Sequence, residues 1–184
     1  LKSDTYYFWK VHVWDKEGQI YESETAEFST AFMDKNDWKA KWIGAGSKSE
    51  PSLPNGFLKS VKEQVTLTDT IHHDGRSLLL RNVFECESDI KRAKVFITGL
   101  GYYELYLNGK RVGDHVLSPA KTNYAKEVLY DTYDVTSQLK KGENVFGIHL
   151  GNGWFNPYKK WWQEYRMQWF GAKRAILQLQ ITYK

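Results

Sequence analysis

The chain has 184 residues, of which 41% are hydrophobic and 16% aromatic, with 8 Trp and 12 Tyr. This much apolar area is typical of a folded domain with a packed core and excludes a disordered tail. No apolar run approaches the roughly 20 residues of a membrane-spanning helix. The formal net charge of +4 is spread thinly, without the dense basic motif of a nucleic-acid-binding protein. The composition therefore predicts a soluble domain whose partners are neither nucleic acid nor membrane.

Cysteine and histidine usage limits the kinds of metal site. The single cysteine, Cys86, excludes an internal disulfide framework and a cysteine-rich metal site. His72 and His73 would point to opposite faces of a strand, and the other three histidines are isolated in sequence. This spacing does not favour zinc.

The first thirty residues are predicted to form a β-hairpin. Residues 6–14 alternate large apolar and mixed side chains, residues 15–18 are typical of a turn, and a second strand is expected near residues 25–32. Two strands alone do not bury a core, so this hairpin must pack on other strands or be the end of a domain that starts upstream. Its pattern resembles the last hairpin of a fibronectin type III-like sandwich. We therefore expect residues 1–33 to be a fragment of such a domain.

A junction and a long loop are predicted next. In residues 34–43, Asn36-Asp37 is expected as a turn or cap, with Trp38 and Trp42 as apolar anchors. Pro, Gly, Asn and Asp breakers recur in residues 44–77, which predicts a loop or insertion with room for a short strand at 65–67.

Short β-strands dominate the rest of the chain. They are predicted at residues 78–85, 92–98, 102–107, 111–117, 144–150 and 174–183. In the last strand, alternate side chains should fall on one face, namely the apolar Ala175, Leu177, Leu179, Ile181 and Tyr183.

Two turns support an antiparallel arrangement. Asn108-Gly109 is typical of a two-residue hairpin turn. One helical turn is expected at Thr136–Lys140, capped by Asp134 or Thr136 and ended by Gly142. The fold class predicted for residues 34–184 is therefore all-β, an antiparallel β-sandwich.

Ordered motifs over residues 38–183 resemble the N-terminal sandwich domain of bacterial α-L-rhamnosidases. They are the W-x-A-x-W-I segment at 38–43, TGLGYYELYLNGKRVGD at 98–114, L-x-P-x-x-T-x-Y at 117–124, YDVT-x-x-L at 133–139, G-x-N-V at 142–145 and LGNGW at 150–154. The resemblance implies a galactose-binding-like jelly roll. One departure is the stretch of some thirty residues between Trp42-Ile43 and the strand that contains Leu80-Arg81.

The resemblance also implies where the chemistry lies. In that family a fibronectin-like domain precedes this sandwich, and a following (α/α)6 barrel holds the catalytic acids. The present chain shows no series of amphipathic helices, and the spacing of its 22 acidic residues marks no pair of facing carboxyl groups such as glycoside hydrolysis needs. We therefore expect no catalytic residue in this chain, and a parent enzyme in a bacterial periplasm or outside the cell.

The segment 152–170 (NGWFNPYKKWWQEYRMQWF) is rich in aromatic side chains, as is typical of a surface that stacks on sugar rings. The alternative is that these rings pack the segment onto the sandwich or onto the next domain. Some members of the family bind L-rhamnose with calcium. Carried over, this implies calcium ligands at Glu104, Asn152 and Pro157, and a carbohydrate-binding set at Glu104, Asn152, Trp154, Pro157, Trp161 and Trp162.

Two roles follow for the domain. It is expected to be a non-catalytic accessory domain that binds terminal L-rhamnose of a plant or microbial glycan, or a purely structural module that positions the barrel of the parent enzyme. In either role its partners include other domains of that enzyme. For Asn108, Asp114 and Asp134, turn and cap roles are favoured over ligation.

Overall fold

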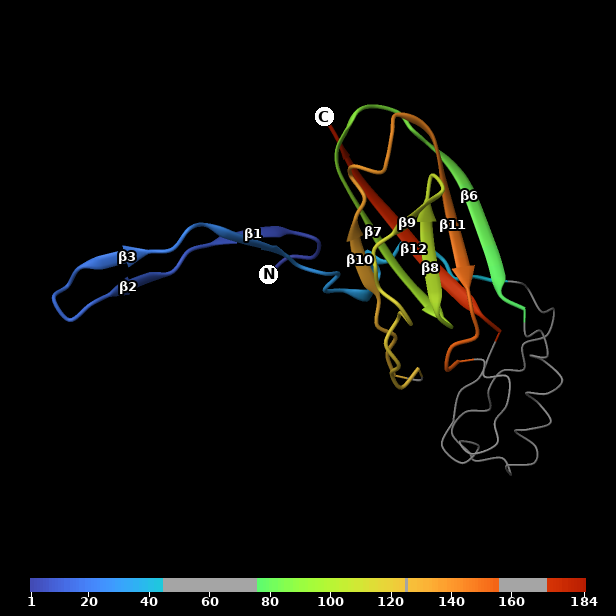
Figure 1. The fold of residues 1–184 in the computed structure, drawn as a ribbon, viewed down its shortest axis with the longest axis horizontal. Coiled ribbons are helices and arrows are strands. Elements are labelled where there is room, and N and C mark those ends of the chain that lie inside the picture. Colours follow the sequence, from blue (N-terminus) through green and yellow to red (C-terminus); the bar gives the residue numbers. More distant parts are fainter. Residues whose placement is uncertain (45–75, 125, 156–171) are drawn as a thin grey trace, which may run out of the picture. The chain divides into compact units, whose positions relative to one another are not determined.

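The computed structural model describes residues 1–44, 76–124, 126–155 and 172–184 (Figure 1). They form two compact units, residues 1–39 and residues 40–184. Every strand pairing in the described part of the chain is antiparallel, and its one helical element is a short 3-10 turn. The described residues contain no helix long and apolar enough to cross a membrane. The predicted all-β class is confirmed.

The first unit is a long two-stranded ribbon. Its inner part pairs β1 (Tyr6–Trp9) with β4 (Ala26–Ser29), and its outer part pairs β2 (His12–Trp14) with β3 (Ile20–Glu22). The predicted strand at residues 6–14 is interrupted, because the Val11 N–H donates to the Ser23 hydroxyl at 3.0 Å instead of to a backbone carbonyl.

The expected turn at residues 15–18 is confirmed. Gly18 has φ +82° and its N–H donates to the Asp15 carbonyl at 3.1 Å. The Asp15 carboxylate accepts the N–H groups of Glu17 and Gln19, each at 2.9 Å. A short acidic side chain and one glycine therefore close the ribbon.

The predicted turn at Asn36-Asp37 is also confirmed, as the 3-10 turn η1 (Lys35–Asp37). Asp34 caps it by accepting the Asn36 N–H at 2.7 Å, and Asp37 accepts the Asp34 N–H at 3.0 Å. Trp38 packs edge-to-face on Phe32 at 5.2 Å between ring centroids, as expected of an anchor.

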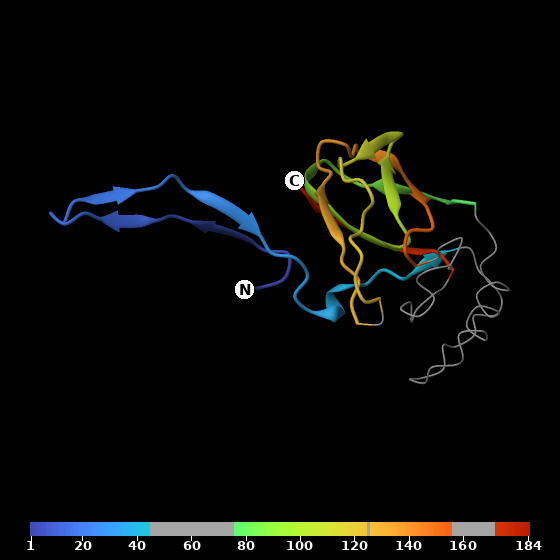
Figure 2. The same ribbon diagram turned by 60° about the horizontal axis from the view of Figure 1, so that its bottom comes forward.

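The second unit is a β-sandwich of two four-stranded antiparallel sheets (Figures 1 and 2). The first sheet has the order β10 (Asp131–Asp134), β7 (Ile90–Leu100), β12 (Arg174–Tyr183) and β5 (Ile43–Gly44). The second sheet has the order β6 (Leu78–Cys86), β11 (Gly142–Leu150), β8 (Tyr103–Leu107) and β9 (Lys110–Val112). Between the sheets lies one core, built mainly from Ala93, Val95, Ile97, Leu105, Leu107, Val135, Phe146, Ile148 and Leu150.

Strands β6, β7, β8, β11 and β12 lie where the sequence predicted them, to within two residues. Along β12, Ala175 is buried, and Leu177, Leu179 and Ile181 pack against the core, so these four lie on one face as predicted. Tyr183, at the end of the strand, is 37% exposed, and the register shifts between Thr182 and Tyr183.

The predicted strand at 111–117 ends early, at Val112. Gly113 has φ +71°, which ends the extended backbone, and a Cβ there would lie 2.3 Å from the Tyr133 ring. The sequence also missed β3, β5 and β10, whose short segments lack a clear alternating pattern. Both predicted turns are confirmed. Asn108 and Gly109 have φ of +52° and +78° between β8 and β9, and Asp134 caps the turn by accepting the Thr136 N–H at 2.9 Å.

The outer faces of the two sheets differ. On the first sheet Phe96 and Ile176 are buried although they alternate with the core positions. Neighbouring segments contact this face: the Ala40 N–H donates to Gln178 Oε1 at 3.1 Å, and the Thr98 hydroxyl donates to the Leu129 carbonyl at 2.6 Å. On the second sheet the outer face carries exposed side chains, as one face of an antiparallel sheet often does.

Candidate functional site

Two glycine-rich loops meet at one end of the sandwich. The Gly151 N–H, just after β11, donates to the Tyr102 carbonyl at 2.7 Å, just before β8. Gly101 has φ +129°, and a Cβ on it would lie 2.3 Å from the Gly151 carbonyl oxygen. Gly153 has φ +55°. A Cβ on Gly153 would lie 2.9 Å from the Tyr102 backbone nitrogen, whereas a Cβ on Gly151 would make only ordinary contact. Gly101 and Gly153 therefore allow the two loops to lie this close.

Asn152 and Trp154, two of the predicted carbohydrate-binding residues, lie in this end loop and are both half-buried. The ammonium of the buried Lys173 donates to Asn152 Oδ1 at 2.7 Å. The Lys121 ammonium lies 4.1 Å from the centroid of the Trp154 ring, a cation–π contact. The loop therefore holds an amide and an indole in defined orientations.

The next aromatic residue has a different role. Phe155 is buried and packs edge-to-face on Tyr124 at 5.5 Å between ring centroids. Its ring thus attaches the loop to the sandwich, which is the packing role that the sequence left open for this segment. The other predicted members of the set, Pro157, Trp161 and Trp162, lie outside the described residues.

Glu104 lies on the outer face of the second sheet. Its Oε2 accepts the Tyr106 hydroxyl at 2.9 Å, and its Oε1 lies 3.7 Å from the Arg111 guanidinium. Asn152 Oδ1 is bonded to Lys173, so a calcium ion at this loop would use the backbone oxygen of Asn152. The described residues contain no group of three or more His, Cys, Asp and Glu side chains suited to a metal ion. Because Pro157 is outside them, the calcium set stays a prediction.

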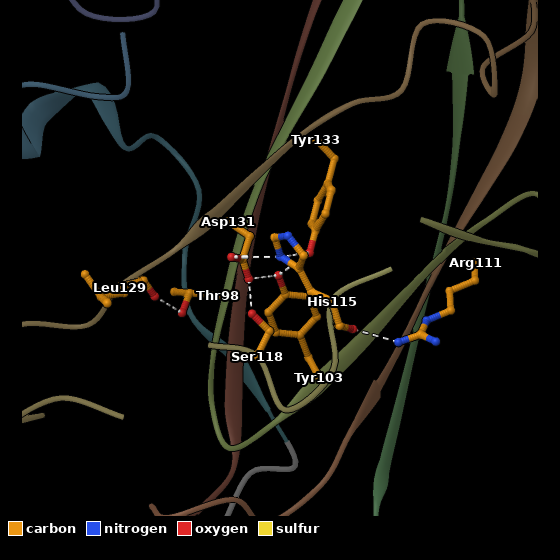
Figure 3. A network of polar contacts seen from close by, with 8 residues as sticks. All are labelled: Thr98, Tyr103, Arg111, His115, Ser118, Leu129, Asp131 and Tyr133. Atoms are coloured by element: carbon orange, nitrogen blue, oxygen red, sulfur yellow. Dashed lines mark hydrogen bonds and ion pairs between the residues drawn. The ribbon is translucent and has the colours of Figure 1, made fainter. Parts of the chain in front are cut away.

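A polar network that the sequence did not predict joins the two sheets along one edge (Figure 3). Its centre is Asp131 on β10, whose Oδ2 accepts the hydroxyl groups of Tyr103 on β8 and Ser118. The Tyr133 hydroxyl lies 3.3 Å from that of Tyr103 and 3.1 Å from His115 Nδ1. His115 Nδ1 also lies 3.4 Å from Asp131 Oδ1.

The network anchors the segment that follows β9. Ser118 and His115 belong to that segment, and Arg111 donates to the His115 carbonyl at 2.7 Å. The edge strand β10 of the first sheet is thereby connected to β8 of the second. A possible sequence signal was the Tyr133-Asp134 pair, but Asp134 forms the cap, and the network acid lies three residues earlier.

Burial and hydrogen bonding keep the network tyrosines neutral. Burial raises the pKa of Tyr103 far above its ordinary value, and the adjacent Asp131 carboxylate raises it further. Burial also raises the pKa of Tyr133. A phenolate at either position would be poorly solvated, and at Tyr103 it would face a carboxylate.

This network predicts a loss of stability at alkaline pH. The pKa of Tyr103 is higher in the folded than in the unfolded state, so its contribution is complete below about pH 10 and decreases as pH rises above that value. We expect the free energy of unfolding to fall by about 1.4 kcal/mol per pH unit from this residue alone. Urea unfolding at about pH 9, 10 and 11 measures the slope for the chain and for Tyr103→Phe. Parallel pH profiles for the two proteins would contradict the prediction.

An antiparallel sandwich with glycine-tightened end loops defines the class of this domain, and comparisons with known proteins give its family. Residues 88–184 match the family model of the alpha-L-rhamnosidase N-terminal domain, and residues 1–34 match that of the Rha78A-like N-terminal immunoglobulin domain. The chain belongs to the α-L-rhamnosidase N-terminal domain family. Immunoglobulin and fibronectin type III domains share the sandwich architecture, so the second match agrees with the hairpin prediction.

Relatives with this domain are several times longer than the chain. An alpha-L-rhamnosidase of Formosa agariphila is 41% identical over 164 residues, which are 88% of this chain and 17% of that protein. One from Alteromonas is 30% identical over 178 residues, 96% of this chain and 18% of that protein.

Solved structures show the same relation. The α-L-rhamnosidase of Dictyoglomus thermophilum is 33% identical with a TM-score of 0.74, and the alignment covers 100% of this chain and 19% of that one. The Aspergillus terreus enzyme, at 23% identity and a TM-score of 0.73 with the same coverage, supports the fold. The chain thus spans less than a fifth of the relatives it matches.

Proposed function

We propose that this chain is a non-catalytic accessory domain of a larger α-L-rhamnosidase. Its family membership and its small share of the length of its relatives support this role. Glycoside hydrolysis needs two carboxyl groups facing each other across the scissile bond. Glu104 and Asp131, the two carboxylates described above, instead accept hydroxyl groups of the chain itself.

The function proposed for the end loop is binding of a terminal L-rhamnose. The observation that carries it is that one loop holds both an amide, bonded to Lys173, and an aromatic ring, in contact with Lys121. Lys173 holds Asn152 by its oxygen, so the amide N–H groups, which have no partner among the described residues, are free to donate to sugar hydroxyls. Trp154 supplies an apolar surface for the C–H groups of the ring. Glu104, Pro157, Trp161 and Trp162 complete the proposed set, with calcium as an optional ligand.

Titration of the chain with L-rhamnose tests this function. We expect heat in isothermal calorimetry at millimolar sugar, and about a tenfold weaker affinity for Trp154→Ala and for Asn152→Ala. Lys110→Ala is the control, because Lys110 is exposed and lies beyond the other end of β8 from the loop. Parallel titrations with calcium and with a chelator decide whether the metal takes part.

Two outcomes would change the assignment. If no heat is seen at any sugar concentration tested, the rhamnose function is wrong and the structural role remains. If the purified chain releases nitrophenol from an aryl rhamnoside, the non-catalytic role is wrong.

The second candidate function is a structural module that positions the catalytic barrel of the parent enzyme. The hairpin of residues 1–33 favours it. Tyr7, Trp9 and Phe28 lie on one face of the inner part of this ribbon, where Tyr7 and Phe28 stack at 5.5 Å between ring centroids. Trp9, Val13 and Phe28 are nevertheless exposed. Two strands do not bury a core alone, so we propose that residues 1–33 complete a separate sandwich domain and that residues 34–184 are the rhamnosidase-type domain.

A further inference from the structure

The outer face of the second sheet has a notch where a glycine lies between two large side chains. Its floor is Gly147 on β11, and its two sides are Arg81 on β6 and Tyr106 on β8. We propose that this notch binds a saccharide that carries a carboxylate, such as a uronic acid. This second binding surface goes beyond the rhamnose function proposed above.

The strand register places these residues side by side. Gly147 pairs directly with Arg81 on one side and with Tyr106 on the other. Directly paired residues point to the same face, and neighbouring strands lie about 4.8 Å apart. Arg81 and Tyr106 are therefore separated by the width of one strand, with no side chain between them.

The floor of the notch is open. A Cβ placed on Gly147 would lie 3.7 Å from the Tyr106 Cβ and would meet no other atom within 4 Å. Along β11 the next residues on this face are Val145 and His149. The notch is thus bounded by the Tyr106 ring, the Val145 side chain, the His149 imidazole and the Arg81 guanidinium.

The aromatic side is held in place before any ligand arrives. The Tyr106 hydroxyl donates to Glu104 Oε2 at 2.9 Å, and Glu104 Oε1 lies 3.7 Å from Arg111. The same hydrogen bond raises the pKa of Tyr106. A fixed ring loses little conformational entropy when a sugar stacks on it.

The charge of the notch indicates an anionic ligand. Arg81 is exposed and has no ion-pair or hydrogen-bond partner among the described residues. Arg111, which pairs with Tyr106 from the neighbouring strand β9, is already bonded to the His115 carbonyl and lies near Glu104. A guanidinium recognises a carboxylate through two parallel hydrogen bonds, which a neutral sugar does not offer.

A sugar fits this face better than a protein partner does. Leu79, with 75% of its surface exposed, and Val83, with 40%, lie on the same face, but Arg81 stands between them along β6. They are separate apolar side chains and not the contiguous patch typical of a protein interface. The polar groups Glu104 and His149 pair with each other across the strands beside the notch and are suited to sugar hydroxyls.

Titration of the whole chain with sodium glucuronate at low salt, with glucose as the neutral match, tests the proposal. We expect glucuronate to bind in the millimolar range and at least about tenfold more tightly than glucose. Arg81→Gln should remove that difference. Lys110→Gln removes an exposed cation at the β8–β9 hairpin and should leave it unchanged.

Gly147→Val separates ligand binding from folding. A Cβ at this position makes only ordinary contact, and valine has a higher β-propensity than glycine, so the free energy of unfolding should stay the same or rise. It should nevertheless abolish glucuronate binding, because it fills the notch. Trp154→Ala should retain glucuronate binding, so failure here and failure of the rhamnose function are distinguishable.

Three binding results would overturn the proposal. They are equal affinities for glucuronate and glucose, equal effects of Arg81→Gln and Lys110→Gln, and undiminished binding by Gly147→Val. Self-association of the chain that Leu79→Lys abolishes, without uronate binding, would identify the face as a protein interface and would also overturn it.

Discussion

Replacing Asn144 by alanine is expected to lower the free energy of unfolding by about 3–5 kcal/mol, because several buried polar groups lose their partner at once. Asn144 is fully buried on β11. Its Nδ2 donates to the carbonyl groups of Lys140 at 2.6 Å and Gly142 at 2.9 Å. Its Oδ1 accepts the Lys140 N–H at 3.0 Å and the Asn108 side-chain amide at 2.9 Å.

These hydrogen bonds connect two turns that are distant in sequence. Asn108 begins the β8–β9 turn, and its own Oδ1 accepts the Val145 N–H at 3.0 Å. Residues 140–142 connect the capped turn to β11. Without the Asn144 amide, partly buried polar groups of both turns lose a hydrogen-bond partner, although Asn108 Nδ2 still donates to the Gln138 carbonyl. Leaving such groups without a partner costs more than the hydrogen bonds themselves contribute.

Urea unfolding of Asn144→Ala measures the effect, with Glu143→Ala as the matched control. Glu143 is the exposed neighbour on the same strand, so its substitution should change stability by less than about 0.5 kcal/mol. Asn144→Asp keeps the acceptor oxygen but loses both donors and introduces a buried charge, so it should be no more stable than the alanine variant. A loss of less than about 1 kcal/mol in Asn144→Ala would contradict the prediction.

Gly101→Ala is expected to destabilise the chain by about 3–5 kcal/mol, the sum of backbone strain and a steric clash. Gly101 has φ +129°, a conformation that essentially only glycine adopts. In addition, the new methyl group would lie 2.3 Å from the Gly151 carbonyl oxygen. The Gly151 carbonyl belongs to the backbone and cannot rotate away as a side chain could. The two end loops would therefore have to move apart.

Gly109→Ala is the matched control for the steric part. Gly109 also has positive φ, +78°, but a Cβ there would meet no atom within 4 Å. Its substitution should cost only the backbone strain, about 1–2 kcal/mol. Because Gly101 supports the loop that carries Asn152, Gly101→Ala should also weaken rhamnose binding, while Gly109→Ala should not. Equal unfolding free energies for the two variants would show that the contact with Gly151 carries no cost.

Much of the fold could be predicted from local patterns. The alternation along β12 and the Asn108-Gly109 pair reflect the two-residue period of a strand and the positive φ of a hairpin turn, both of which depend only on neighbouring residues. The short strands β5 and β10 were missed because pairing with β12 and β7, not their own sequence, makes them extended.

The candidate sites were predicted less completely. The motif around residues 150–154 indicated Asn152 and Trp154, and they do lie together in one end loop. The partners of these residues, Lys173 and Lys121, are distant in sequence and form no motif with them. The Glu104 side chain contacts Tyr106 and Arg111, and these contacts depend on the register between β8 and β9.

Periodicity, turn chemistry and ordered motifs are local properties, so they were enough to predict the all-β class, most strand positions, the turns and the family resemblance. The tertiary structure alone decided which polar groups meet. Asp131 joins Tyr103 and Ser118 only because the two sheets face each other, and the Gly147 notch exists only because Arg81 and Tyr106 pair on either side of it. Contacts of this kind arise from strand order and register, which are set by burial of the whole core.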